Sequence, residues 1–457
     1  MGTNGILGLG SIREAQAAMR AGRVTSEALT EAALTAIAAP DGEGARTALS
    51  IYRAQALAAA RGVDAMRKAG LELAPLAGIP ISIKDLFDVV GEPTRAGSVV
   101  LADAPPARAD APAVANLRRM GAVIAAKTNM TEFAYSGIGI NPHYGTPRNA
   151  WDRAAGRIPG GSSSGAAVSV TDGMALAAVG TDTGGSVRIP AALCGLVGFK
   201  PTAGRHPMAG VVPLSESLDS LGPLAWSVSC CRIMDAALNG LLPPPASPRP
   251  VAGLRLAVPQ RLVLDDLDRT VAVRFERALA RLSAAGAHLI ELAFDEIEGA
   301  KDIARLGGIV APEAWAWHRQ LISRARDGYD PRVLSRIEGG AKVSAADYID
   351  MLRLRIALQA ATDRATRPFD ALILPAVAVV APEIAPLEAD AKTFFRANAL
   401  ILRNTNIGNL LNRPGVSLPI GEPGGAPVGL MVMGERFADA ETLDRAEGIE
   451  TALTQER

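Results

Sequence analysis

The order strand, helix, strand recurs along this chain and limits the fold more than any other feature. A short apolar segment at 78–84 (GIPISIK) precedes a helical pattern that ends at Gly121, and a second apolar segment follows at 122–127 (AVIAAK). The same order returns in three later segments, 254–259, 268–286 and 288–292. Two strands joined by a crossover helix form the βαβ unit of a largely parallel sheet. The pattern therefore predicts an α/β fold.

The N-terminal part of the chain has a helical pattern instead. Ser11 and Glu14 have the spacing of a capping box before a short helix that stops at Gly22. Ser26 is expected to cap a second helix, and a third is expected over 47–69. Further strands are expected at 370–374 and within 415–434, and a proline-rich stretch, 243–250, separates the two βαβ patterns.

Charge and composition exclude several classes of protein. The 457 residues are 49% hydrophobic, which allows a large core, and 47 basic residues balance 47 acidic ones, so no nucleic-acid or anionic-membrane surface is indicated. The apolar run at 371–381 is broken by Pro375 and is shorter than the roughly 20 residues of a membrane span. Three cysteines without metal-ligand or disulfide spacing indicate reduced thiols and no metal site. We expect a soluble cytoplasmic protein.

The serine run GGSSSG at 160–165 is the first candidate for chemistry. A flexible linker is disfavoured because an apolar segment, AAVSV, follows at once. A phosphate-binding loop is disfavoured because the run lacks both the Gly-Lys-Ser/Thr ending and the GxGxxG pattern. The run formally matches the GxSxG nucleophile elbow, which would make Ser163 the nucleophile.

Histidine is too scarce to support that elbow. An α/β-hydrolase triad needs a histidine after the nucleophile and the acid, and it is expected near the end of the chain. His143 precedes the serine run, and His206 and His288 lie far from the chain end. The last histidine, His318, lies on a probable helix beside tryptophans, as a packed or surface residue would. A desolvated, neutral lysine is the alternative base. Lys84, Lys127 and Lys200 each end or follow an apolar strand, and spacing alone does not choose among them.

The chain resembles the amidase signature hydrolases. The resemblance covers most of the sequence from Gly70 to Gly434 and rests on the combination of several motifs. These motifs are PLAGIPISIKDLFDV, KTNMTEFAYSG, YGTPRNAWD, GGSSSGAAVSV, AVGTDTGGSVRIPAALCGLVGFKPT and SLDSLGPLA. The resemblance implies a single large α/β domain with a mixed central sheet flanked by helices.

The resemblance also implies a Ser–cis-Ser–Lys triad. By motif, Lys84 is the base, Ser162 the bridging serine after a cis peptide bond, and Ser186 the nucleophile. The implied reaction hydrolyses a carboxamide to a carboxylic acid and ammonia or an amine through an acyl-enzyme, with no metal or cofactor. Ser164 departs from the glycine that many relatives carry at this place in the loop.

Other residues are expected to support this reaction. Backbone N–H groups of the turn Thr183, Gly184, Gly185 and Ser186 are candidates for an oxyanion hole, since glycine permits the tight turn that makes amides converge. Ser163 is expected to position the triad, and Asp182 and Arg188 to form a mainly structural ion pair. Three aromatic residues near the variable segment 319–340 are weaker candidates for the substrate pocket: Trp315, Trp317 and Tyr329.

These expectations divide the chain into four segments. Residues 1–70 form a helical segment that packs on the core, 71–242 the catalytic core, 243–250 a connection, and 251–457 the C-terminal part of the same domain, including the variable pocket region. The expected partner is a small-molecule amide, and a homodimer is expected from family habit. Two alternatives remain: the A subunit of a glutamyl-tRNA amidotransferase, and a catalytically silent binding module with the same fold. The presence of all three triad residues disfavours the silent module.

Overall fold

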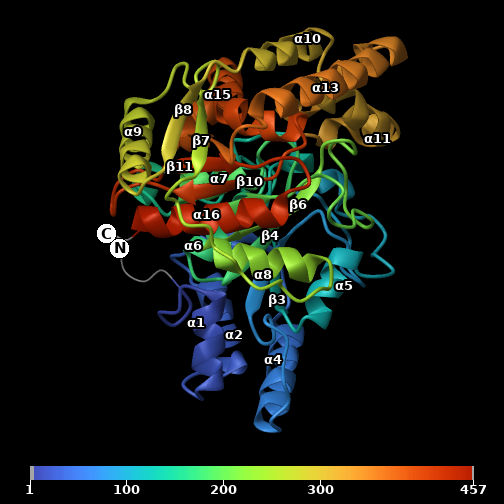
Figure 1. The fold of residues 1–457 in the computed structure, drawn as a ribbon. Coiled ribbons are helices and arrows are strands. Elements are labelled where there is room, and N and C mark those ends of the chain that lie inside the picture. Colours follow the sequence, from blue (N-terminus) through green and yellow to red (C-terminus); the bar gives the residue numbers. More distant parts are fainter. Residues whose placement is uncertain (1–4, 455–457) are drawn as a thin grey trace.

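One mixed β-sheet runs through the middle of the molecule. The computed structural model describes residues 5–454, and within them eleven strands form this sheet, in the order β1-β3-β2-β4-β6-β5-β10-β11-β9-β7-β8 (Figure 1). The strands are β1 (Ala48–Ile51), β2 (Pro80–Lys84), β3 (Val123–Thr128), β4 (Ala177–Asp182), β5 (Val197–Lys200), β6 (Ser220–Ala225), β7 (Arg255–Pro259), β8 (His288–Leu292), β9 (Ala371–Pro375), β10 (Gly415–Pro419) and β11 (Gly429–Met433).

Both expected βαβ units are present. Strands β2 and β3 pair in parallel and are connected by the helix α5 (Pro112–Arg119), and β7 and β8 pair in the same way with α9 (Arg269–Ala284) between them. The sheet is mixed because β6, β10 and β11 run antiparallel to their neighbours. The two halves of the sequence meet in one continuous sheet, since β5 pairs with β10. The structure therefore confirms a single α/β domain with a mixed central sheet.

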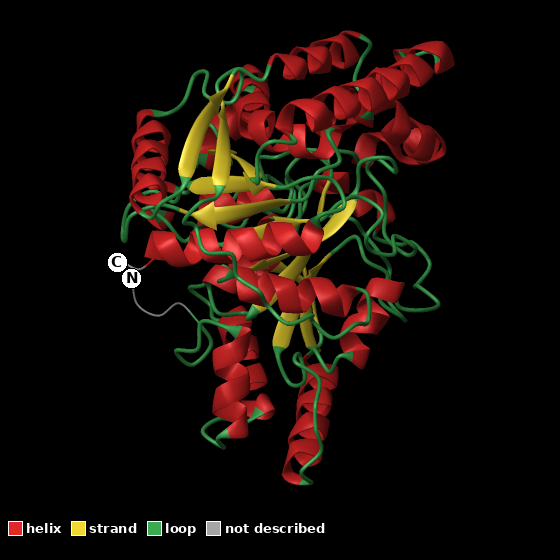
Figure 2. Ribbon diagram, viewed as in Figure 1, coloured by secondary structure: helices red, strands yellow, loops and turns green. Residues whose placement is uncertain are grey.

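Helices cover both faces of this sheet (Figure 2). Their bounds are α1 (Ile12–Arg20), α2 (Ser26–Ala38), α3 (Gly44–Thr47), α4 (Arg53–Lys68), α5 (Pro112–Arg119), α6 (Ser164–Thr171), α7 (Arg188–Cys194), α8 (Val228–Leu238), α9 (Arg269–Ala284), α10 (Gly299–Arg305), α11 (Val310–Ala325), α12 (Pro331–Gly339), α13 (Ala345–Thr366), α14 (Ile384–Ala389), α15 (Ala391–Leu410) and α16 (Asp439–Thr454).

The alternation of side chains along β4 separates two layers of the core. Val179 packs in the cluster that includes Val228 of α8, whereas Ala178 packs with Ala167 of α6 and Ala191 of α7. Such alternation follows from the two-residue period of a strand, and every β4 residue is buried. Helices α8 and α16 lie across the face turned to the viewer in Figure 1, and α10, α11 and α13 gather at the top of that view.

The N-terminal segment differs from the sequence prediction in two places. The first expected helix is present with its capping box between Ser11 and Glu14. The second is capped by Thr25 rather than Ser26, whose hydroxyl instead donates to the buried carbonyl of Gly78. The third helix was expected from residue 47, but 48–51 form the edge strand β1 against β3, and the helix α4 begins only at Arg53. Pairing with an available sheet edge overrode the local helical preference of these residues.

None of the helices within residues 5–454 combines the length and the apolar character that crossing a membrane requires.

Candidate active site

Parallel strands bring the lysine and the serine loops to one edge of the sheet. Lys84 is the last residue of β2, and β2 pairs in parallel with β4, which ends at Asp182 just before the turn that contains Ser186. The carboxyl ends of neighbouring parallel strands lie at the same sheet edge, which is where α/β proteins place their sites. Segments about one hundred residues apart in the sequence therefore meet here.

Lys84 is completely buried and hydrogen-bonded to two hydroxyl groups. Its Nζ donates to Ser162 Oγ at 2.7 Å and to Thr181 Oγ1 at 2.9 Å. Burial lowers the pKa of Lys84 to about 7, against the opposing pull of the Asp219 and Asp182 carboxylates. A lysine with this pKa is substantially neutral near physiological pH and can accept a proton.

Ser162 stands between Lys84 and the amino end of α6. The peptide bond from Gly161 to Ser162 is cis, as the family resemblance implied. The three serines of the run, Ser162, Ser163 and Ser164, are fully buried, so none of them faces open solvent. The Oγ of Ser163 donates to the carbonyl of Thr181 at 3.4 Å, which ties the run to β4.

Ser186 lies at a cavity of about 160 Å³. Its backbone carbonyl accepts a hydrogen bond from the N–H of Ser163 at 3.4 Å, which links the two serine loops directly. The cavity is assembled from the loop after β3, the turn after β4, the loop before β6, and the helices α11, α12 and α15. It is lined by Ala134, Tyr135, Ser136, Thr183, Gly184, Ser186, Leu214, Val310, Arg336, Leu402 and Asn406.

The turn before Ser186 presents free backbone N–H groups. Among the residues that the structure describes, the amides of Gly184, Gly185 and Ser186 have no hydrogen-bond acceptor. Gly185 has φ +134°, and a Cβ there would lie 2.0 Å from Thr405 Oγ1. The Thr405 hydroxyl donates to the Gly184 carbonyl at 2.7 Å and so holds the turn. Unsatisfied amides at a tight turn form an anion-binding concavity.

A buried ion pair anchors both ends of that turn. Asp182 and Arg188 are completely buried and joined by two bonds, Nε to Oδ2 at 3.0 Å and Nη2 to Oδ1 at 2.9 Å. Asn409 of α15 donates to Asp182 and accepts from Arg188. Although burial alone raises the pKa of Asp182, the Arg188 charge and hydrogen bonds outweigh it and lower the pKa to about 2. The pair is present, as expected from the sequence.

Geometry distinguishes among the three candidate lysines. Lys127 pairs with the Asp85 carboxylate at 3.1 Å. Lys200 is buried, and burial lowers its pKa to about 7 as well, but its Nζ donates to the carbonyl of Pro201 at 2.6 Å. Only Lys84, among the three, contacts a serine of the run. The contacts of Lys84 therefore fit the base that the resemblance implies, and its catalytic role stays a prediction.

The three aromatic residues suggested for the pocket lie outside the set that lines the cavity at Ser186, and two of them pack around one ring. Trp317 and Tyr329 pack around Phe133, with ring centroids 6.1 and 5.2 Å from its own. His318 Nδ1 and the Tyr329 hydroxyl are hydrogen-bonded at 2.9 Å. Trp315 packs against the main core. None of the three suggested residues is among those that line the cavity at Ser186, so their contact with substrate stays a prediction.

Two residues with contacts at this site had no role in the sequence interpretation. Thr181 is the second partner of Lys84. The Asp219 carboxylate accepts hydrogen bonds from the Thr183 hydroxyl and from the N–H groups of Leu214 and Ser215. Burial raises the pKa of Asp219 to about 6, although these hydrogen bonds lower it. Its motif, SLDSLGPLA, carried part of the resemblance, but a short motif does not reveal which group its carboxylate faces.

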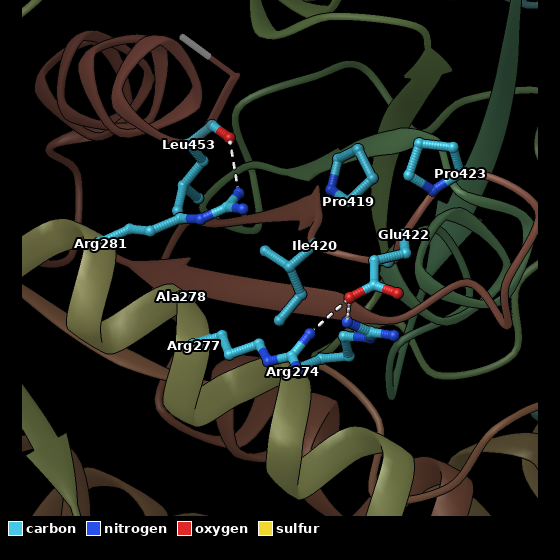
Figure 3. Close-up of a pocket in the computed structure, with 10 residues that line it drawn as sticks. Arg274, Arg277, Ala278, Arg281, Pro419, Ile420, Glu422, Pro423 and Leu453 are labelled. Atoms are coloured by element: carbon cyan, nitrogen blue, oxygen red, sulfur yellow. Dashed lines mark hydrogen bonds and ion pairs between the residues drawn. The ribbon is translucent and has the colours of Figure 1, made fainter. Parts of the chain in front are cut away.

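Other hollows on the molecule are lined by other groups. A cavity of about 200 Å³ lies between α9 and the turn after β10, where Arg274 and Arg277 point to Glu422 and Arg281 reaches the carbonyl of Leu453 (Figure 3). A groove of about 560 Å³ is lined by Trp151, Trp226 and the glycine-rich turn 421–425, among others. In residues 5–454 no group of three or more histidine, cysteine, aspartate or glutamate side chains is placed to hold a metal ion.

Comparisons with known proteins find this chain similar to amidases over nearly its whole length. The sequence profile of the family described as Amidase matches residues 28–443. The chain is 40% identical to the 2-amino-5-chloromuconic acid deaminase of Comamonas testosteroni, over 96% of each protein. It is 32% identical to the A subunit of the glutamyl-tRNA(Gln) amidotransferase of Chloroflexus aggregans, over 95% of this chain and 94% of the relative. A solved amidase structure superposes with a TM-score of 0.86 at 34% identity, covering 96% of this chain and 99% of the other.

Proposed function

Because the chain belongs to the amidase family and is a hydrolase of carbon–nitrogen bonds, we propose that it cleaves its amide with a Ser186–Ser162–Lys84 triad. The observation that carries this proposal is the fully buried Lys84, with a pKa of about 7, bonded to Ser162 beside the Ser186 turn. A neutral amine next to a relaying hydroxyl is what activation of a serine requires in the absence of histidine.

The proposed reaction has two halves. Lys84 accepts a proton from Ser162 while Ser162 accepts one from Ser186, and Ser186 Oγ attacks the amide carbonyl carbon. The carbonyl oxygen, now negative, is bound by backbone N–H groups of Thr183, Gly184, Gly185 and Ser186, of which the last three are the free amides described above. Lys84 returns the proton to the departing nitrogen, which leaves as ammonia or an amine, and an acyl-enzyme remains. Water then repeats the steps and releases a carboxylic acid.

Neighbouring residues are proposed to hold the triad and the Ser186 turn in place. The Asp182–Arg188 pair fixes the turn on both sides, and Ser163 connects the serine run to β4 and to the Ser186 backbone. Thr181 orients the Lys84 amine through its second hydrogen bond. In this proposal the substrate is a small-molecule amide, and the protein works in the cytoplasm without a cofactor. The protein is further proposed to form a homodimer, which light scattering of the purified protein tests.

Replacing the nucleophile tests the reaction. Ser186→Ala should lose at least 10³-fold in kcat for ammonia release from a panel of small amides, while its Tm stays within about two degrees of the parent. Mass spectrometry of the parent, quenched during turnover, should find the acyl group on Ser186. Ser335→Ala, an exposed serine of α12, is the matched control and should retain full activity. Unchanged activity of a folded Ser186→Ala protein would remove the assignment.

A glutamine-dependent amidotransferase component is the second candidate. Relatives described as the A subunit of glutamyl-tRNA(Gln) amidotransferase are 32% and 34% identical to this chain over most of its length. The two candidates differ in what the isolated chain does. A purified chain that releases ammonia from small amides is an independent amidase, whereas one that needs a tRNA-binding partner before it hydrolyses glutamine belongs to the second class.

A further inference from the structure

The cavity at Ser186 contains a cation and no acidic side chain. Arg336 lines it together with apolar side chains of Leu214, Val310 and Leu402. Besides the backbone and Ser186, the remaining polar groups of the wall are neutral side chains. They belong to Tyr135, Ser136, Thr183 and Asn406. The charge balance of this cavity indicates the charge of the molecule that binds in it.

Arg336 is held in place without a carboxylate. Its Nη1 donates to the carbonyl of Tyr135, and its guanidinium lies over the Tyr135 ring, 4.1 Å from the ring centroid. In the described part of the chain no aspartate or glutamate forms an ion pair with it, whereas its neighbour on α12, Arg332, pairs with Asp330 at 3.0 Å. Burial lowers the pKa of Arg336, yet a guanidinium stays protonated at neutral pH.

A positive charge in such a place favours an anionic ligand. Removing a cation from water is costly unless an anion compensates its charge. Arg336 uses one N–H for the Tyr135 carbonyl, so the other N–H groups of its planar guanidinium fork are available to a ligand. That fork matches the two oxygens of a carboxylate, and stacking on Tyr135 fixes its plane. The apolar walls suit a short hydrocarbon chain between the carboxylate and the amide that reaches Ser186.

The same cavity disfavours a ligand with an ammonium group. An amino-acid amide such as glutamine carries a second, positive charge beside its carboxylate. Here no lining residue is acidic, and Leu402 and Leu214 provide apolar wall instead. An ammonium group bound near Arg336 would lose its hydration and face a like charge.

We propose that the substrate is the monoamide of a dicarboxylic acid without an ammonium group, and that Arg336 binds its free carboxylate while Ser186 attacks the amide at the other end. This inference rests on the proposed function, because it places the scissile amide at Ser186. It adds the chemical class of the substrate and separates it from free glutamine.

Three matched amides test the class. Glutaramate carries a carboxylate and an amide, glutamine is the same molecule with an added α-ammonium group, and valeramide lacks the carboxylate. The parent enzyme should prefer glutaramate to either of the others by tenfold or more in kcat/KM. Arg336→Gln should lower kcat/KM for glutaramate by about 10²-fold, mainly through KM, and change valeramide hydrolysis less than threefold.

Control variants identify the cause of any change. Arg332→Gln removes a neighbouring arginine of α12 that does not line the cavity, and it should leave the preference intact. Leu402→Asp supplies an acidic wall residue and should shift the preference toward glutamine. Equal kcat/KM of the parent for glutaramate and valeramide, or an equal loss for both in Arg336→Gln, overturns the inference and leaves the amidase reaction standing.

A binding measurement separates this inference from the reaction mechanism. In the Ser186→Ala background, glutaramate should raise the Tm of the protein, and addition of Arg336→Gln should abolish that rise, whether or not the parent turns the amide over. Stabilisation that survives Arg336→Gln contradicts the carboxylate site. If glutaramate binds through Arg336 but Ser186→Ala hydrolyses it as fast as the parent, the proposed nucleophile fails and the carboxylate site holds.

Discussion

At the scale of the residue, the proposed reaction depends on a single buried lysine. Lys84 has no exposed surface, and its amine is surrounded by the hydroxyls of Ser162 and Thr181. Burial penalises its charged form, while Asp219 and Asp182 partly restore it, and the balance brings the pKa to about 7. A pKa in this range suits the two roles proposed for Lys84, which are to accept a proton and to return it.

The pH dependence of the reaction follows from this balance. Only neutral Lys84 can accept a proton, so kcat/KM should rise with pH, tenfold per unit well below 7, and level off above a midpoint near 7. The measurement is a pH profile of kcat/KM with an uncharged amide. A profile that is flat between pH 5 and 9 would contradict the role of Lys84.

Asp219→Asn serves as the control for this profile. The Asp219 carboxylate favours charged Lys84, so its removal should lower the pKa of Lys84 and move the midpoint of the rising limb to lower pH. The amide of asparagine can still accept a hydrogen bond from Thr183. A midpoint that moves to higher pH would show that Asp219 acts on the lysine in another way.

At the scale of the element, one ion pair joins a strand to two helices. Asp182 ends β4, Arg188 begins α7, and Asn409 on α15 bonds to both. The Asp182 carboxylate also accepts the backbone N–H groups of Val187 and Arg188, so it organises the start of a helix that lacks another side-chain cap. The turn with Ser186 lies between the two charged residues and is held from both sides.

Breaking the pair from one side should destabilise the protein strongly. Arg188→Met leaves a buried carboxylate without its counter-ion and should lower the free energy of unfolding by about 3–5 kcal/mol. Urea denaturation followed by circular dichroism measures this. The double variant Asp182→Asn, Arg188→Met should lose less than Arg188→Met alone, because no uncompensated charge remains.

An exposed ion pair provides the comparison. Arg353 on α13 contacts Asp350 at 3.1 Å, with 76% and 57% of their side chains exposed, so Arg353→Met should produce no measurable loss of stability. If Arg188→Met is equally harmless, the buried pair does not hold the turn.

At the scale of the whole molecule, the site needs both halves of the chain. Thr405 and Asn409 of α15 bond to Gly184 and Asp182, which lie in the segment predicted to be the catalytic core. The pairing of β5 with β10 joins the halves in one sheet. The stretch 241–250, by contrast, has no regular structure and is largely exposed, and it contains the residues 243–250 predicted to form a connection.

Cutting that connection should leave an active protein. We expect a protease site inserted within 243–250 to be cleaved with most of the activity retained, because the cleaved parts stay paired through the sheet. Size-exclusion chromatography should show one species that contains both fragments. Residues 1–242 expressed alone should be inactive, since they lack the α15 contacts to the Ser186 turn; an active fragment would refute the shared site.

The sequence alone predicted the α/β class, most strand positions and the loops that carry Lys84, Ser162 and Ser186. Hydrophobic periodicity and glycine turns are local properties, and the family motifs mark the positions of the three proposed triad residues. The sequence failed at β1, where residues 48–51 pair with a strand more than seventy positions away and so escape local patterns.

Tertiary structure alone decided which lysine faces a serine of the run and which groups line the cavity at Ser186. Lys84, Lys127 and Lys200 have similar sequence neighbourhoods and differ only in what the folded chain places at their amines. The position of Arg336 at the Ser186 cavity likewise depends on α12 packing beside the loop after β3, about two hundred residues earlier in the chain. The loops that carry Lys84, Ser162 and Ser186 can be recognised from local sequence. The pKa of a buried side chain and the charge of a cavity, by contrast, arise from contacts between segments that are distant in the sequence.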